Sequence, residues 1–142
     1  MITIKQLLDD KGRDVWSINP EDTVFNAIKC MAEKGIGALI VLENGMLVGI
    51  ISERDYARKV ILKNKASQDT MVREIMVSPV VCGRPDQTVD ECMALITDKR
   101  IRHLPIIDKN QVVGVISIGD LVKSIIAQQQ FVIEQLEHYI AG

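Results

Sequence analysis

The feature that most constrains this chain is an internal repeat. Residues 48–55 (VGIISERD) return 65 positions later as residues 113–120 (VGVISIGD). At this offset residues 15–56 align with residues 80–121 without a gap, and 12 of the 42 pairs are identical. Self-similarity on this scale indicates two copies of one supersecondary unit that bury their apolar surfaces together. We therefore expect two half-size lobes that need each other.

Each copy predicts the element order strand, helix, strand, strand, helix. Thr23 and Thr88 precede apolar residues at the i, i+3, i+4 and i+7 spacing of an amphipathic helix. Two short apolar runs follow each helix and are separated by a turn sequence, as in a β-hairpin. Gly35 should end the first helix, and Arg100 at the matching position predicts a different ending for the second. The expected fold class is α/β (α+β), with two βαββα repeats.

A polar stretch at residues 64–69 separates the two copies. We expect a first domain over residues 1–68, with a short helix near its start, and a second domain over residues 69–142, with a long helix at its end. A second short helix is expected at residues 72–76. A three-stranded sheet with helices on one side leaves its other face apolar, so the two domains should pack about a pseudo-twofold axis. Clefts between packed units are the usual places for small ligands.

Composition argues against several classes of function. The formal net charge is −2, whereas a protein whose main partner is nucleic acid normally carries a basic excess. No apolar run is long enough to span a bilayer, and the first residues lack a signal-peptide core, so a cytoplasmic protein is expected. Three cysteines without C-x-x-C spacing predict reduced thiols, and two widely spaced histidines predict no metal site.

Ser52 with Asp55, and Ser117 with Asp120, are the main candidate ligand residues. Each Ser-x-x-Asp stands where a strand should pass into a helix. An aspartate at such a place can accept hydrogen bonds from both hydroxyls of a ribose, as an acidic residue does in dinucleotide-binding folds. The alternative is purely local, because Ser-x-x-Asp is also a capping box. Duplication copies caps as well as binding sites, so the recurrence leaves both interpretations open.

Cations distinguish the two copies. Arg102 and His103 stand at the start of an apolar strand, where the first copy has Gly37 and Ala38. Arginine suits phosphate because its planar guanidinium can bind two oxygens at once. One site should therefore be crowded and basic, and the other open and neutral apart from Arg54. As a catalytic base, His103 lacks a recognisable nucleophile, and no phosphate-binding glycine motif is present.

With these residues in place, the chain resembles the tandem CBS-domain family, whose paired unit is the Bateman module. The resemblance rests on residues 49–55, 101–108 and 114–120 and covers residues 1–142, as in a stand-alone CBS pair. It implies a homodimer of modules and an adenosine ligand (AMP, ADP, ATP, NAD(H) or, in some members, S-adenosylmethionine) in the cleft between the repeats. The residue roles that it implies are ribose binding by Asp55 and Asp120 beside Ser52 and Ser117, phosphate binding by Arg54, Arg102 and His103, and an adenine slot at the backbone of Gly37 and Ala38.

This resemblance favours a non-catalytic sensor, in which nucleotide binding shifts lobe or dimer geometry and a partner protein responds. The alternative is a structural or interaction module whose clefts stay empty and whose helices dock a partner. A small enzyme that acts on nucleotides through His103 is the third and weakest hypothesis. The last helix, about residues 121–139, is longer than its lobe requires. We expect it to pack on a partner chain rather than to fold back over its own lobe.

Overall fold

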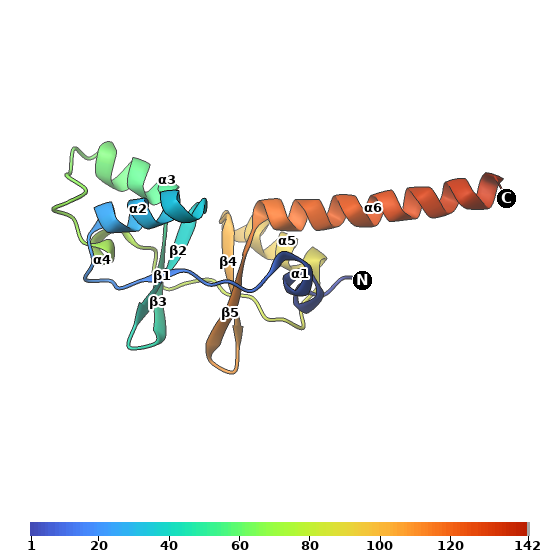
Figure 1. The fold of residues 1–142 in the computed structure, drawn as a ribbon, viewed down its shortest axis with the longest axis horizontal. Coiled ribbons are helices and arrows are strands. Elements are labelled where there is room, and N and C mark those ends of the chain that lie inside the picture. Colours follow the sequence, from blue (N-terminus) through green and yellow to red (C-terminus); the bar gives the residue numbers. More distant parts are fainter. Residues whose placement is uncertain (142) are drawn as a thin grey trace. The chain divides into compact units, whose positions relative to one another are not determined.

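The computed structural model describes residues 1–141, which form two compact units (Figure 1). Unit 2 is the continuous stretch Val15–Val81, whereas unit 1 combines Met1–Asp14 with the chain from Cys82 onward. The mixed α/β class with two repeats is confirmed. The grouping differs from the expected division after residue 68, because the first 14 residues group with the second repeat and residues 69–81 group with the first. The pseudo-twofold relation between the repeats stays a prediction.

Unit 2 is built on a three-stranded sheet in the order β1-β2-β3. Strand β1 runs parallel to β2, and β2 and β3 form an antiparallel hairpin with an irregularity between Val41 and Leu42. The turn of the hairpin has positive φ at Asn44 and Gly45, as the sequence predicts for a tight two-residue turn. Its elements are β1 (Ser17–Ile18), α2 (Val24–Lys34), β2 (Ala38–Glu43), β3 (Met46–Ser52), α3 (Glu53–Tyr56), a π-helical turn (Ala57–Ile61) and α4 (Val72–Ile75).

Unit 1 repeats this plan with one strand fewer. Its antiparallel hairpin β4-β5 has its irregularity between Ile106 and Ile107, the positions that match Val41 and Leu42. In place of a first strand, Gly83 makes only an isolated parallel bridge to this hairpin. The elements of unit 1 are α1 (Ile4–Lys11), α5 (Val89–Lys99), β4 (His103–Asp108), β5 (Gln111–Ser117) and α6 (Ile118–Ala141).

The caps of α2 and α5 explain why these helices begin and end where they do. The side chains of Thr23 and Thr88 accept the backbone amides of Asn26 and Glu91, as expected. Gly35 ends α2 in the left-handed conformation. The expectation of a different ending at Arg100 was wrong. Arg100 adopts φ 55° and ψ 43°, and the amide after it reaches back to α5, so the hydrogen bonds that close the helix outweigh the steric cost of a side chain there.

Short leading helices are exchanged between the repeats. In unit 1, the amide of Ile4 donates to the carbonyl of Gln87 at 2.8 Å. In unit 2, the amide of Val72 donates to the carbonyl of Asp22 at 2.8 Å, which is the equivalent bond. Helix α1 therefore covers the second repeat and α4 covers the first.

Two glycines allow this close approach. A Cβ on Gly114 would lie 2.6 Å from Cδ2 of Leu8, and a Cβ on Gly49 would lie 2.5 Å from Sδ of Met76. Leu8 is fully buried, so its contact with the strand is part of the core of unit 1. Glycine at this strand position is thus explained by close packing of a leading segment.

The apolar residues that the helical and strand patterns mark as inward form the cores. In unit 2 the buried cluster consists of Val24, Ala27, Met31, Leu39, Val41, Ile51, Val60, Val72 and Ile75. In unit 1 the buried residues include Ile4, Leu7, Leu8, Val89, Cys92, Ile96, Leu104, Ile106, Ile116 and Leu121.

Candidate functional site

The predicted ligand residues converge on one corner in each unit, where a hairpin passes into a helix. In unit 2, Ala38 pairs directly with Ser52, and the carbonyl of Gly37 accepts the amide of Glu53 at 3.0 Å. The end of one strand, the start of its neighbour and the first helical turn are therefore held side by side.

The corner of unit 1 has the same construction. His103 pairs with Ser117, and the carbonyl of Arg102 accepts the amide of Ile118 at 2.9 Å. We call these two places the Ser-x-x-Asp corners. Each brings together every predicted site residue of its own repeat.

In unit 2 the carboxylate of Asp55 closes a capping box. Its Oδ2 accepts the backbone amide of Ser52 at 2.9 Å and the hydroxyl of Ser52 at 3.0 Å. Its Oδ1 lies 3.2 Å from Nζ of Lys59, one helical turn further on. The side chain of Asp55 is 13% exposed, so this carboxylate is largely withdrawn from water.

In unit 1 the carboxylate of Asp120 also closes a capping box, with a different lysine. Its Oδ2 accepts the backbone amide of Ser117 at 2.8 Å and Nζ of Lys11 at 2.6 Å. The same Nζ donates to the carbonyl of Val115 at 2.6 Å. Burial alone would raise the pKa of Asp120, but the hydrogen bonds from Lys11 and Ser117 and the charge of Lys11 lower it below its ordinary value of 3.8.

The capping-box interpretation is therefore correct for both aspartates, and it does not exclude a ligand. The backbone amide of Ser117 and the ammonium of Lys11 both reach Oδ2 of Asp120, and neither reaches its Oδ1. In Asp55 both oxygens already have partners. The two corners thus differ in how much acceptor capacity remains.

Sequence reasoning missed the two lysines. Lys59 stands four residues after Asp55, which is the spacing at which side chains meet on a helix, so a signal for it existed. Lys11 is 109 residues from Asp120 and carries no local signal. Only the packing of α1 onto the second repeat brings it to the corner.

The predicted phosphate-binding cations flank these corners. Arg54 and Arg102 are exposed, and among residues 1–141 neither side chain forms an ion pair with a carboxylate. His103 is half-buried at the first position of β4. Gly37 and Ala38 place no charge where unit 1 has Arg102 and His103, and the contrast between a crowded, basic site and an open, neutral one stays a prediction. The roles of these residues toward a ligand stay predictions.

The described residues offer little for covalent or metal chemistry. No group of three or more His, Cys, Asp or Glu side chains among residues 1–141 could hold a metal ion. Burial, aided by the neighbouring Glu91 carboxylate, raises the pKa of Cys92 to about 11, so this thiol stays protonated near neutral pH. Burial also raises the pKa of Cys82.

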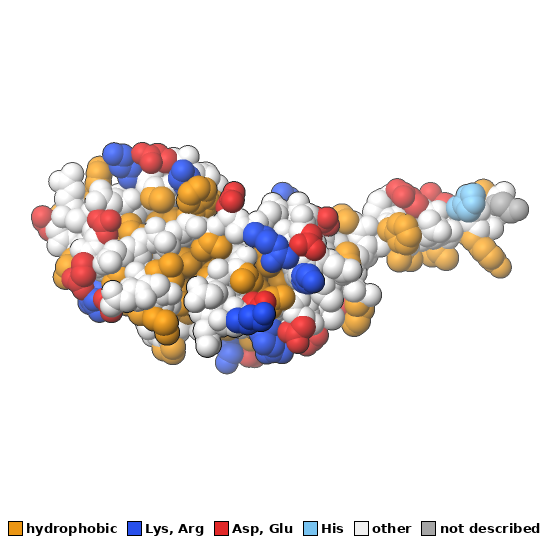
Figure 2. Space-filling view, turned by 60° about the horizontal axis from the view of Figure 1, so that its bottom comes forward, with side chains coloured by type: hydrophobic (Ala, Val, Ile, Leu, Met, Phe, Trp, Pro, Cys, Tyr) orange, Lys and Arg blue, Asp and Glu red, His pale blue; other side chains and the backbone are white. Residues whose placement is uncertain are grey.

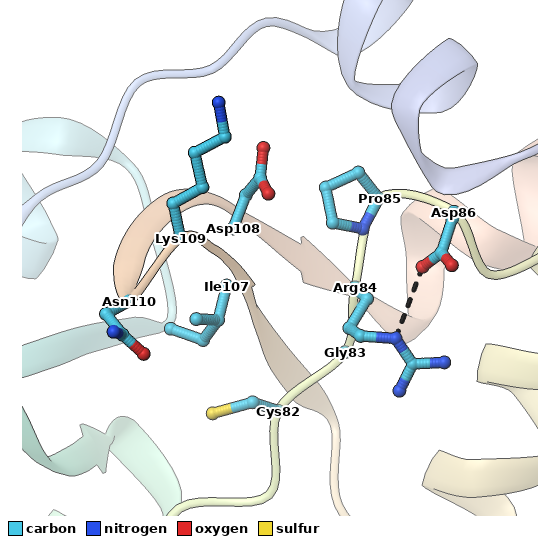
Figure 3. Close-up of a pocket in the computed structure, with 9 residues that line it drawn as sticks. All are labelled: Cys82, Gly83, Arg84, Pro85, Asp86, Ile107, Asp108, Lys109 and Asn110. Carbon is cyan, nitrogen blue, oxygen red and sulfur yellow. Dashed lines mark hydrogen bonds and ion pairs between the residues drawn. The ribbon is translucent and has the colours of Figure 1, made fainter.

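A separate depression of about 610 Å³ lies in unit 1 between the start of the repeat and the β4-β5 turn (Figure 3). At its edge, Nε of Arg84 lies 3.2 Å from the carboxylate of Asp86. At the matching place in unit 2, Arg73 bridges the carboxylates of Glu21 and Glu43. The residues that line the depression are Cys82, Gly83, Arg84, Pro85, Asp86, Ile107, Asp108, Lys109 and Asn110.

Comparison with known proteins finds the CBS domain twice, at residues 4–62 and 72–127. CBSX3 of Arabidopsis thaliana, a mitochondrial CBS domain-containing protein, is 36% identical over 150 residues, which cover 99% of this chain and 72% of that protein. YhcV of Bacillus subtilis is 33% identical over 113 residues, which cover 80% of each chain.

Among residues 1–141, no helix combines the length and apolarity needed to cross a membrane.

Solved structures agree with this match. The CBS domain protein NE2398 shares 50% identity and a TM-score of 0.84, covering 87% of this chain and 97% of its own. A protein with CBS domains from Burkholderia ambifaria shares 52% identity and a TM-score of 0.85, covering 89% of this chain and 96% of its own. The repeat, the two matched corners and these similarities together show that the chain belongs to the CBS-domain family, with two CBS domains in tandem.

Proposed function

We propose that this chain is a non-catalytic sensor of adenosine nucleotides (AMP, ADP, ATP or NAD(H)) in which the Ser-x-x-Asp corners bind the ribose. The observation that carries the proposal is the geometry at Asp120, where the amide of Ser117 and the ammonium of Lys11 both reach Oδ2 and neither reaches Oδ1. In each corner a mostly buried carboxylate lies next to the start of a strand. A hydrogen bond to a charged acceptor of this kind is worth about 1.5–3 kcal/mol.

The corner of unit 1 is the stronger candidate. Oδ1 of Asp120 is available to a ribose hydroxyl, and the nearby Arg102 offers a guanidinium to phosphate. The lowered pKa of Asp120 keeps it charged at neutral pH. At the corner of unit 2 a ribose must share Asp55 with Lys59, while Arg54 supplies the cation and the Gly37–Ala38 backbone the adenine slot.

Two relatives bear on this proposal. Inosine-5′-monophosphate dehydrogenase of Methanocaldococcus jannaschii is 34% identical over 113 residues, but the match spans only 22% of that enzyme. The crystal structure of the CBS domain pair of MJ0100 was solved in complex with 5′-methylthioadenosine and S-adenosylmethionine. Because its identity to this chain is 24%, the likeness concerns the fold, and its ligands serve here to choose compounds for testing.

One observation favours a second candidate function, an interaction module that binds no nucleotide. Both carboxylates already have protein partners, so the corners are stable without a ligand. In this alternative the corners only stabilise the starts of α3 and α6. The protein would then act through a docked partner.

Thermal unfolding with a ligand panel separates the two candidates. We expect at least one of AMP, ADP, ATP, NAD⁺, NADH, S-adenosylmethionine and 5′-methylthioadenosine to raise the melting temperature, because binding at 100 times Kd adds about 2.7 kcal/mol of stability. Asp120→Asn should reduce the shift more than Asp55→Asn. Thr97→Ala, on the exposed side of α5, serves as a matched control and should respond like the parent. If no compound shifts the parent, the interaction module is favoured, and turnover of a compound would revive the enzyme hypothesis.

We also propose that the chain forms a homodimer. The CBS-CP12 protein of bloom-forming cyanobacteria is hexameric and shares 29% identity and a TM-score of 0.78 with this chain, which covers 70% of it. Sedimentation equilibrium of the parent tests the proposal, with twice the monomer mass expected.

A further inference from the structure

The last helix of unit 1 carries an apolar surface that its own unit does not cover. Only the first turns of α6 pack on the unit, where Leu121 is fully buried. Every residue from 131 to 141 is exposed. The alternative, that this helix folds back over its own lobe, therefore does not hold for its second half. The exposed apolar residues of α6 include Val122, Ile126, Phe131, Val132, Ile133, Leu136, Tyr139 and Ile140.

Apart from Phe131, which lies on the other side of the helix, these residues form one stripe. Positions 118, 122, 125, 129, 132, 136 and 139 alternate in steps of four and three, the spacing of the seam of a coiled coil. All are apolar except Gln129 near the middle. Ile126, Ile133 and Ile140 widen the stripe on one flank. Figure 2 shows apolar side chains gathered along one side of the extended helix, with acidic side chains on the opposite side.

An uncovered stripe of this kind needs a partner. Isolated helices shorter than about 12–15 residues are marginal in water, and most helical stability in proteins comes from packing of an amphipathic face. The 11 residues from 131 to 141 have no packing partner within the described chain.

The distribution of charge indicates which partner fits. The seam and both flanks carry no charged side chain from residue 121 to residue 140, since the second flank holds Gln128 and Gln135. Lys123, Glu134 and Glu137 lie on the far side of the helix. Two copies of this stripe can therefore meet without like-charge repulsion, and the amide of Gln129 can both donate and accept across the pair. A membrane surface fits poorly, because residues 124–141 contain two glutamates and no Lys or Arg.

We propose that α6 pairs with α6 of a second copy of this chain, through the stripe from Val122 to Ile140. The inference rests on the proposed homodimer and assigns its contact, and it is independent of nucleotide binding. A polar residue at a single seam position commonly fixes the register of such pairs, and Gln129 takes that role here.

The test combines mass and hydrogen exchange on the full chain. The disrupting variant is Val132→Lys with Leu136→Lys, which places charges in the seam. The matched control is Ala127→Lys with Gln130→Lys, which adds the same charge on the exposed opposite side of the helix. Sedimentation equilibrium gives the mass, and amide exchange is read over residues 131–141.

We expect the parent and the control to be dimeric and the disrupting variant to dissociate with a Kd at least 100-fold higher. Amide exchange over residues 131–141 should be at least tenfold faster in the disrupting variant than in the parent. A dimeric parent with unprotected amides in this segment would overturn the α6 contact and leave the homodimer standing. A monomeric parent would overturn both, and equal loss in the control would overturn the role of the stripe.

Discussion

In unit 2 the lysine that holds the corner aspartate comes from the next turn of the same segment, whereas in unit 1 it comes from the other end of the chain. Lys59 follows Asp55 by four residues, and Lys11 reaches Asp120 from α1. The same carboxylate geometry is thus reached by a local contact in one repeat and by a long-range contact in the other. In unit 1, helix α1 contributes Leu8 to the core and also supplies Lys11, the cation that contacts the candidate ligand residue Asp120.

The surface beside the hairpin turn, which we call the rim, also differs between the two units. Arg73 joins Glu21 and Glu43 in unit 2, while Lys5 at the matching place in unit 1 makes no ion pair within the described residues. The two repeats therefore share equivalent backbone hydrogen bonds, whereas the side chains around these bonds differ. Such divergence allows two sites of one fold to bind different ligands, or the same ligand with different affinity.

The largest expected effect comes from the contact of Leu8, in α1, with the β4-β5 hairpin of unit 1. Leu8→Ala should lower the free energy of unfolding by about 2–5 kcal/mol, because it removes a fully buried leucine side chain from the core. Met76→Ala, the matching change in unit 2, should cost less because Met76 is only half-buried. Urea denaturation measures both.

Hydrogen exchange then locates the damage of Leu8→Ala. Amides of residues 82–121 should exchange faster, while those of residues 15–81 keep their protection. Equal acceleration in both stretches would contradict the assignment of α1 to the second repeat.

A smaller effect is expected from Lys11→Met. Without the ammonium group the pKa of Asp120 should rise, because burial then acts with less opposition. A carboxylate whose pKa is lowered in the folded state contributes stability above its ordinary pKa of 3.8 and loses it as the pH falls through the lower folded value. The variant should be about 1 kcal/mol or less below the parent at pH 7, since Lys11 is partly exposed, and the gap should close below pH 3.8.

NMR titration of the Asp120 carboxyl carbon checks this prediction directly. Lys59→Met is the matched control, because it removes the lysine of the other corner. An unchanged pKa of Asp120 in Lys11→Met would show that the two side chains are not paired in solution.

The smallest effect is expected from Arg73→Gln, which removes the two ion pairs on the rim of unit 2. All three side chains are well exposed, so the midpoint of denaturation should fall by less than in Lys11→Met. The difference should vanish in 1 M salt, where the Debye length is about 3 Å. Lys5→Gln should leave the midpoint unchanged, and a larger loss there than in Arg73→Gln would reverse the comparison of the rims.

Much of the fold could be predicted from the sequence because its signals are local. The Thr caps and the hairpin turns each depend on residues within a few positions of one another, and the repeat at an offset of 65 residues can be read directly from the chain. The leading segments were visible too, as similar apolar spacing at residues 4–8 and 72–76. Their exchange was not predictable, because either segment has the apolar side chains to pack on either hairpin. The same long-range contact hid Lys11 from the candidate site, while the left-handed Arg100 depends on hydrogen bonds that composition does not reveal.

Isothermal titration calorimetry with AMP and 2′-deoxy-AMP tests most directly whether a carboxylate corner recognises a ribose diol. If the corner of unit 1 binds the sugar, AMP should bind the parent at least about tenfold more tightly than 2′-deoxy-AMP, which is the factor expected for one charged hydrogen bond. In Asp120→Asn this preference should largely disappear. Binding of both nucleotides with equal affinity, or an undiminished preference in Asp120→Asn, would contradict the account.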